Sequence, residues 1–150
     1  SPSRGLGDVY KRQNSLIKVK VAKAREKGIE MTVKAFVPKR MSISFGDMGV
    51  IYGNLIDNAI EASMKIQREK RFVDVETKYQ DGKLLIVVSN SKNMESNPAF
   101  ATTKENKRKH GRGIRSVRRV AEQYGGNLLL EDEGGTFKAS LLLTNVERLE

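Results

Sequence analysis

The side chains best suited to bind a polar ligand lie in one predicted helix. Asn54 and Asn58 are spaced i, i+4, so both project from nearly the same helix face. Asparagine is a poor helix former, and an amide beside an apolar helix face needs a hydrogen-bond partner. We interpret the pair as facing a bound polar ligand. The alternative is a hydrogen bond between two elements of the core.

Two further stretches carry groups of a similar kind. Asn90 follows an apolar run at 84–88, and a basic stretch at 102–113 ends in Gly111-Arg112-Gly113. Glycines that open a helix leave N–H groups free to approach an anion, and the helix dipole favours negative charge there. The basic stretch is therefore a candidate phosphate site. A short Gly-x-Gly is also often only a turn, and a charge run is often only a solvated face.

Amide side chains suit a metal that is shared with phosphates. An amide carbonyl is a hard oxygen donor of the kind Mg²⁺ accepts, and it adds no negative charge beside a polyphosphate. The sequence contains no Gly-x-x-x-x-Gly-Lys-Ser/Thr, which excludes a P-loop. Gly111-Arg112-Gly113 lacks the third glycine and the preceding strand of a dinucleotide-binding fingerprint.

Composition limits the class of protein. A chain of 150 residues without cysteine predicts one domain with a real core and no disulfides or thiolate metal site. No apolar run is long enough to span a bilayer, and no signal peptide is visible. The net charge of +10 is compatible with nucleic acid, an anionic membrane surface or a phosphorylated small molecule as partner. Aromatic residues do not interleave with the basic runs, which argues against stacking on single-stranded nucleic acid.

Periodicity and turn residues predict the elements that hold these groups. Residues 1–13 are expected to be a loose, non-native tail without function. We expect helices at 14–27, 48–69 (capped by Asp47) and 112–124, strands at 29–37, 72–79, 83–89, 127–131 and 136–143, an Asp-Gly hairpin turn at 80–82, a loop at 90–110 and a polar C-terminal tail. Hairpins mixed with helices predict an α+β fold with helices on one face of a sheet.

Several motifs resemble one known family. Residues 54–62, Asn-Leu-Ile-Asp-Asn-Ala-Ile-Glu-Ala, resemble the N-box of the GHKL ATPase superfamily, which includes DNA gyrase, MutL and the histidine kinases. Residues 110–114 with Tyr124-Gly125-Gly126 resemble its second glycine box. Gly135-Thr136-Phe137 and the spacing of Phe100 and Lys104 resemble two shorter histidine kinase motifs. The resemblance covers residues 14–143 and is closest to sensor kinases of peptide quorum sensing and citrate-type regulation.

The resemblance implies a fold and a division of the chain. It implies a Bergerat-type two-layer α/β sandwich, in which helices cover one face of a mixed, mainly antiparallel sheet and a long lid closes over ATP. Residues 14–28 would be a connector helix. Residues 29–145 would form the ATP-binding catalytic domain.

The resemblance also assigns roles to single residues. Asn58 would be the Mg²⁺ ligand, and Asn90 stands where the family has an adenine-reading Asp, although residues 91–97 lack the Gly-x-Gly of that box. Asn54 replaces a water-activating Glu and, as an amide, cannot act as a general base, so no catalytic residue is assigned. Lys65 or a basic lid residue would meet the phosphates, and His110, the only histidine, would help to place the lid. The implied ATP-binding residues are Asn54, Asn58, Asn90, Thr103, Lys104, Gly111, Arg112, Gly113 and Thr136.

These roles predict the catalytic domain of a two-component sensor histidine kinase. Such a domain would bind ATP with Mg²⁺ and donate the γ-phosphate to a histidine outside this chain. Its partners would be the acceptor-histidine helical hairpin of the parent kinase and a response regulator, with no direct contact to nucleic acid. We expect a cytoplasmic domain of a membrane-bound homodimeric parent. The alternatives are another GHKL ATPase or anti-sigma-type serine kinase, and a basic nucleic-acid-binding domain.

Overall fold

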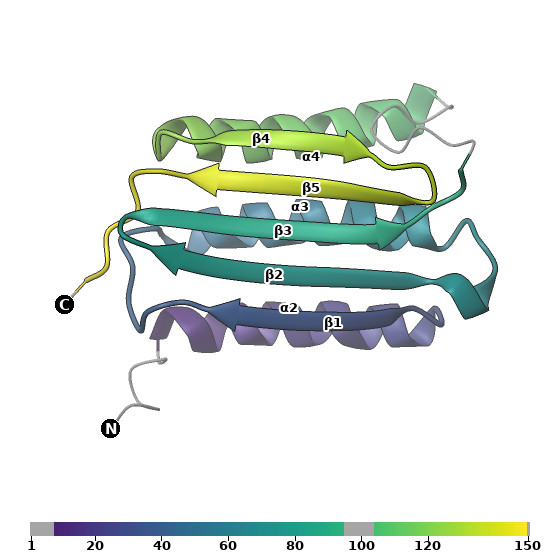
Figure 1. The fold of residues 1–150 in the computed structure, drawn as a ribbon, viewed down its shortest axis with the longest axis horizontal. Coiled ribbons are helices and arrows are strands. Elements are labelled where there is room, and N and C mark those ends of the chain that lie inside the picture. Colours follow the sequence, from purple (N-terminus) through teal and green to yellow (C-terminus); the bar gives the residue numbers. More distant parts are fainter. Residues whose placement is uncertain (1–7, 95–103, 150) are drawn as a thin grey trace.

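The computed structural model describes residues 8–94 and 104–149, with side chains for residues 15–94 and 111–149. The strands of the described chain form a single sheet, and the α-helices pack on one face of it (Figure 1). Its elements are α2 (Asp8–Glu26), β1 (Glu30–Phe36), α3 (Phe45–Ser63), the 3₁₀ helix η1 (Arg68–Lys70), β2 (Phe72–Gln80), β3 (Lys83–Ser91), α4 (Lys104–Gln123), β4 (Asn127–Asp132) and β5 (Thr136–Leu143). Within this part of the chain no helix is both long and apolar enough to cross a membrane.

The sheet has the order β1-β2-β3-β5-β4. β1 pairs with β2 in parallel, and every other neighbouring pair is antiparallel. In Figure 1, α2, α3 and α4 lie side by side behind this sheet. The predicted α+β class, with a mixed and mainly antiparallel sheet covered on one face, is confirmed.

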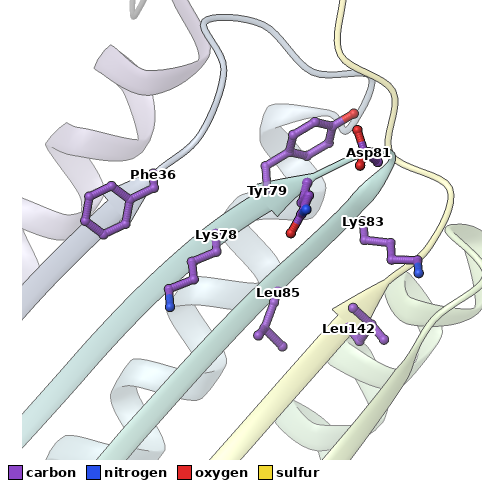
Figure 2. Close-up of a pocket in the computed structure, with 8 residues that line it drawn as sticks. Phe36, Lys78, Tyr79, Asp81, Lys83, Leu85 and Leu142 are labelled. Atoms are coloured by element: carbon purple, nitrogen blue, oxygen red, sulfur yellow. The ribbon is translucent and has the colours of Figure 1, made fainter.

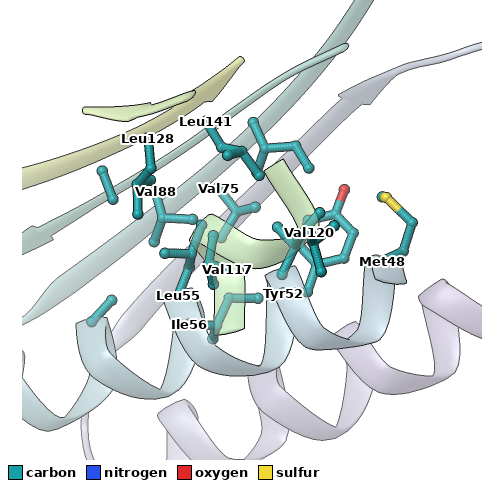
Figure 3. Close-up of a cluster of buried hydrophobic side chains, with 14 of the residues drawn as sticks. Met48, Tyr52, Leu55, Ile56, Val75, Val88, Val117, Val120, Leu128 and Leu141 are labelled. Carbon is teal, nitrogen blue, oxygen red and sulfur yellow. The ribbon is translucent and has the colours of Figure 1, made fainter. Parts of the chain in front are cut away.

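The core lies between β3 and the helices. The inward side chains of β3, Leu84, Ile86 and Val88, are almost completely buried. They belong to one buried cluster with apolar residues of α3 such as Leu55 and Ile56. Figure 3 shows Val88 together with these two residues of α3. Burying each such side chain is worth about 1.5–3 kcal/mol, so this contact fixes where α3 lies on the sheet.

The predicted hairpin turn is confirmed. Asp81 and Gly82 both have positive φ angles, 48° and 85°, as a two-residue type I′ turn requires. Gln80 pairs with Lys83 across the turn, which sets the register of β2 on β3. The register places Val73 opposite Asn90 at the far end of the hairpin.

Both ends of α3 differ from the prediction. The N-cap is Ser44, whose Oγ accepts from the Asp47 N–H at 3.1 Å. The Asp47 carboxylate instead accepts from the Tyr124 hydroxyl at 2.6 Å, and burial, followed by this hydrogen bond, raises the pKa of Tyr124. The helix ends at Ser63, not Glu69, because the chain turns where Arg71 donates to the carbonyls of Met64 and Ile66.

The predicted loose ends of the chain also need correction. α2 begins at Asp8, so residues 8–13 are helical, while residues 1–7 lie outside the described part. Extending a helix is easier than nucleating one, so its first turns need no apolar period in the sequence. The C-terminal segment is not a free tail: Val146 is fully buried, its carbonyl accepts from the Tyr79 hydroxyl, and Arg148 forms a bridge with Met41.

The predicted loop at 90–110 is shorter at both ends. β3 continues through Asn90 to Ser91, and α4 begins at Lys104. The polar residues at 89–91 hid the end of the strand, since β pairing through Ser91 needs no apolar side chains. The central part of the predicted ATP lid, 95–103, lies outside the described residues.

A buried hydrogen bond between the layers provides a test of this packing. The Tyr52 hydroxyl of α3 lies 2.6 Å from Thr77 Oγ1 of β2. Tyr52→Phe should reduce the free energy of unfolding by about 1 kcal/mol, because Thr77 is left without this partner. Adding Thr77→Val should cost little more, because both polar groups are then gone. Urea unfolding monitored by circular dichroism measures both effects, and additive losses would contradict the pairing.

Candidate functional site

Asn54 and Asn58 lie on the flank of α3 that faces α4. Both are half-buried. Asn54 Nδ2 donates to the Val50 carbonyl at 2.8 Å, which fixes its orientation along the helix. Among the described residues, the Asn58 amide has no hydrogen-bond partner. Asn58 is therefore the member of the pair whose whole amide is available to a ligand.

Asp57, which lies between the two asparagines in sequence, faces the opposite neighbour. Its Oδ1 is 2.7 Å from Lys20 Nζ and 3.9 Å from Lys23 Nζ, both on α2. α3 thus contacts α2 through Asp57 and α4 through Asn54. The candidate site and the ion pairs with α2 therefore lie within two turns of one helix.

Gly113 allows α4 to approach α3 at Asn54. A Cβ atom at position 113 would lie 2.8 Å from Asn54 Oδ1, too close for a normal contact. By contrast, a Cβ atom at Gly111 would meet nothing within 4 Å. The prediction that Gly111-Arg112-Gly113 opens the helix is wrong, because α4 begins at Lys104 and both glycines lie inside it. Only the first turn of a helix has unpaired N–H groups, so these two glycines do not offer free N–H groups of a helix start to an anion.

Asn90 is the last inward-facing residue of β3. It follows Leu84, Ile86 and Val88 on the same face of the strand and is 2% exposed. Its Nδ2 donates to the Ser91 carbonyl at 2.9 Å, so its Oδ1 points away from that carbonyl. No described residue donates to Oδ1. Because a buried acceptor without a partner is costly, this oxygen is suited to accept a hydrogen bond from a ligand.

The remaining predicted site residues are less closely grouped. Thr136 is the first residue of β5, is half-buried and pairs with Ser91. Arg112 is exposed on α4. Lys104 begins α4, but its side chain, that of His110 and all of Thr103 lie outside the described part. The structure brings Asn54 to Gly113 and places Thr136 beside the strand end that carries Asn90.

Lys92 was not predicted from the sequence. This residue follows β3 directly, and its side chain is completely buried. Its Nζ lies 2.9 Å from Asp132 Oδ1, at the turn between β4 and β5. The Lys92 hydrogen bond is the main cause of a lowered pKa of Asp132. The two residues lie 40 positions apart in a charge-rich chain, so no local pattern indicates that they pair.

Cavities lie at both ends of the sheet in the described part of the chain. One, of about 570 Å³, lies on the open face beside the β2–β3 turn, lined by Phe36, Lys78, Tyr79, Gln80, Asp81, Lys83, Leu85 and Leu142 (Figure 2). None of the predicted site residues lines it. The other, of about 620 Å³, lies at the opposite end and includes Lys65, Lys70, Ser91, Lys92 and Gly135. Lys65, predicted to meet phosphates, is therefore close to the end of β3.

The donor chemistry fits a magnesium ion shared with a ligand. Among the described residues, no group of three or more His, Asp or Glu side chains is arranged to hold a metal. Mg²⁺ is commonly held by one or two protein oxygens together with phosphates and water. The half-buried Asn58 amide supplies one such oxygen.

Comparison with known families identifies the domain. Residues 43–144, more than half of the chain, match the GHKL domain. The chain belongs to the GHKL domain family. The matched region of this GHKL domain runs from Ile43, just before α3, to Thr144, just after β5, and contains every predicted site residue.

Solved structures show the same fold. The nucleotide-free catalytic domain of histidine kinase ThkA superposes with a TM-score of 0.66 at 20% identity, covering 88% of this chain and 91% of that one. The mycobacterial sensor histidine kinase MprB gives 0.61 at 17%, covering 87% and 94%. Full-length ShkA, in complex with AMPPNP, gives 0.69 at 19%, covering 95% of this chain and 32% of ShkA. No curated protein sequence matches the chain.

The two glycines of α4 make a matched pair of tests. Gly111→Ala should stabilise the domain by about 0.5–1 kcal/mol, because alanine is the better helix former and its Cβ meets nothing. Gly113→Ala should not stabilise the domain, or should destabilise it, because the added Cβ would press against Asn54. Urea unfolding of both variants measures the difference. Equal stabilisation by both would show that the helices do not approach closely at Gly113.

Proposed function

We propose that this GHKL domain binds ATP with Mg²⁺ and is the catalytic domain of a two-component sensor histidine kinase. The observation that carries the proposal is the Asn90 side chain, which is buried, oriented, and has a carbonyl oxygen without a described donor. Adenine presents an exocyclic amino group, which is a matching hydrogen-bond donor. The family membership supports the same ligand.

The proposed site assigns a part of ATP to each group of residues. Asn58 holds Mg²⁺ through its amide oxygen, Asn90 accepts from the adenine amino group, and Thr136 lies on the strand beside it. The basic residues Lys104 and Arg112 neutralise the phosphates, and the Thr103 hydroxyl donates a hydrogen bond to them. Gly113 allows α4 to approach α3 at Asn54, and Gly111 leaves open space beside α4 for the ligand.

The chemistry of Asn54 favours phosphate transfer over hydrolysis. An amide cannot accept the proton of an attacking water, so the site lacks a general base at this position. The Asn54 amide nitrogen also donates to the Val50 carbonyl. ATP would therefore persist in the site until an external nucleophile, the acceptor histidine, reaches its γ-phosphate.

The parent protein is proposed from the motif resemblance. It would be a membrane-anchored, homodimeric kinase of the quorum-sensing or citrate-sensor subgroup, with this domain in the cytoplasm. Residues 14–28, within and just after α2, would connect the acceptor-histidine hairpin to the domain at 29–145. The Asp57–Lys20 ion pair would hold that connector against α3. A response regulator would receive the phosphoryl group.

Asn58→Ala tests the proposed metal ligand. A fluorescent ATP analogue titrated with Mg²⁺ should bind this variant at least about tenfold more weakly than the unchanged chain, since losing a charge-assisted contact costs about 1.4 kcal/mol or more. In EDTA, where no metal can be held, the two proteins should bind almost equally.

Asn127→Ala, which changes an exposed asparagine at the start of β4, is the matched control. It should bind as the unchanged chain does. Equal Mg²⁺-dependent affinity for Asn58→Ala and the control would refute the role of Asn58. Salt-dependent DNA binding without any nucleotide affinity would favour the nucleic-acid alternative instead.

A further inference from the structure

The segment that follows Asn90 is held in an unusual way. Residues 91–97 contain no glycine, although Asn90 stands at the position where the resembled family begins its first glycine box. Instead of a glycine, this segment contains Lys92, whose side chain is completely buried. The contacts of Lys92 therefore determine the path of the chain directly after the proposed adenine contact.

One peptide group links Lys92 to the orientation of Asn90. The carbonyl of Ser91 accepts from Asn90 Nδ2 at 2.9 Å. The N–H of the same peptide group, that of Lys92, donates to the Gly135 carbonyl at 3.0 Å. Because a peptide group is planar, fixing its N–H also fixes its carbonyl. The direction of Asn90 Oδ1 therefore depends on how residue 92 lies against the β4–β5 turn.

The Lys92 ammonium fastens residue 92 to that turn. Nζ lies 2.9 Å from Asp132 Oδ1 and donates to the Asn93 carbonyl at 3.1 Å. Asp132 Oδ1 also accepts from the Gly134 N–H at 3.1 Å, so one carboxylate oxygen organises both the turn and the lysine. A fully buried ammonium needs such partners, which makes the position of Lys92 well defined.

We propose that the Lys92–Asp132 ion pair positions the Asn90 amide and thereby sets the preference of the site for adenine. Lys92 is a positioning residue, because its ammonium is buried against Asp132 and Asn93 and acts through the peptide group at 91–92. In this chain the ion pair, and not a glycine box, sets the path of the backbone at the end of β3. This inference rests on the proposed function, since it concerns the base-reading part of the same site.

Discrimination between ATP and inosine triphosphate tests the proposal. Inosine triphosphate has a carbonyl where ATP has the exocyclic amino group, so it cannot donate to Asn90 Oδ1 from that position. The unchanged chain should prefer ATP by roughly tenfold, the value of one well-placed hydrogen bond. Lys92→Met keeps the apolar stem but removes the ammonium, and should reduce this preference by at least about threefold, mainly through weaker ATP binding.

Two further variants complete the test. Asp132→Asn keeps an acceptor for Gly134 but removes the negative charge, and it should also reduce the preference for ATP. It provides the test should Lys92→Met fail to fold. Lys138→Met removes a cation from the neighbouring strand, where Lys138 Nζ is 4.0 Å from Glu131 Oε1 in a partly exposed pair. This control should leave the preference unchanged.

A measurement without nucleotide gives an independent readout. The side-chain amide protons of Asn90 should exchange slowly in the unchanged chain, because Nδ2 is buried and bonded to the Ser91 carbonyl. In Lys92→Met they should shift in the NMR spectrum and exchange faster, while those of Asn58 should not.

The outcomes separate the inference from the proposed function. No ATP binding by the unchanged chain would refute the proposed function. ATP binding with an unchanged ATP preference in folded Lys92→Met and Asp132→Asn would refute only the inference. An equal loss of both nucleotides would also refute it, because the ion pair would then be merely structural.

Discussion

The packing of α3 on β3 is the contact on which the rest of the structure depends. The inward face of β3 is aliphatic through Leu84, Ile86 and Val88, and the same face then ends in Asn90. The apolar residues of α3 pack on this face, and this packing fixes the position of its two asparagines relative to the sheet. The hydrophobic core thus positions polar groups that contribute nothing to it.

The sheet ends are tied together by polar contacts of a different kind. At the end where α3 begins, Tyr124, which directly follows α4, donates to Asp47, and Tyr79 donates to the Val146 carbonyl of the C-terminal segment. At the other end, Ser63 and Ser91 pair at 2.8 Å, and Lys92 joins β3 to Asp132. Each contact joins residues that are far apart in sequence. Together these contacts restrict the movement of the helices and strands that carry the site residues relative to one another.

Much of this architecture could be predicted from local pattern. Alternation predicted β1 and β2, and a near-continuous apolar run predicted β3. The Asp81-Gly82 pair predicted the turn between β2 and β3, because positive φ angles favour these residue types. The helix ends could not be placed in the same way. Asp47 and Ser44 are both good caps, and the choice between them depends on Tyr124, 77 residues away from Asp47. The start of α4 was misplaced because Gly111 and Gly113 are typical of a helix boundary.

The site was predictable in its residue types more than in its geometry. The spacing of Asn54 and Asn58 placed both on one face of α3, but only the folded structure separates the amide bonded to Val50 from the one without a described partner. Gly113 was expected to contact a phosphate, whereas in the structure its lack of a side chain leaves room for Asn54. Lys92 could not be found at all, because burial of a cation depends on a partner 40 residues away.

The most direct test of the central claim is an NMR titration of the chain with AMPPNP and Mg²⁺. It would follow the side-chain amide resonances of Asn58, Asn90 and Asn127. We predict that the Asn58 and Asn90 amides shift together and saturably, that the Asn58 shift requires Mg²⁺, and that Asn127 does not respond. Absence of shifts at both site asparagines, or shifts confined to the open sheet face around Phe36 and Leu142, would contradict the account.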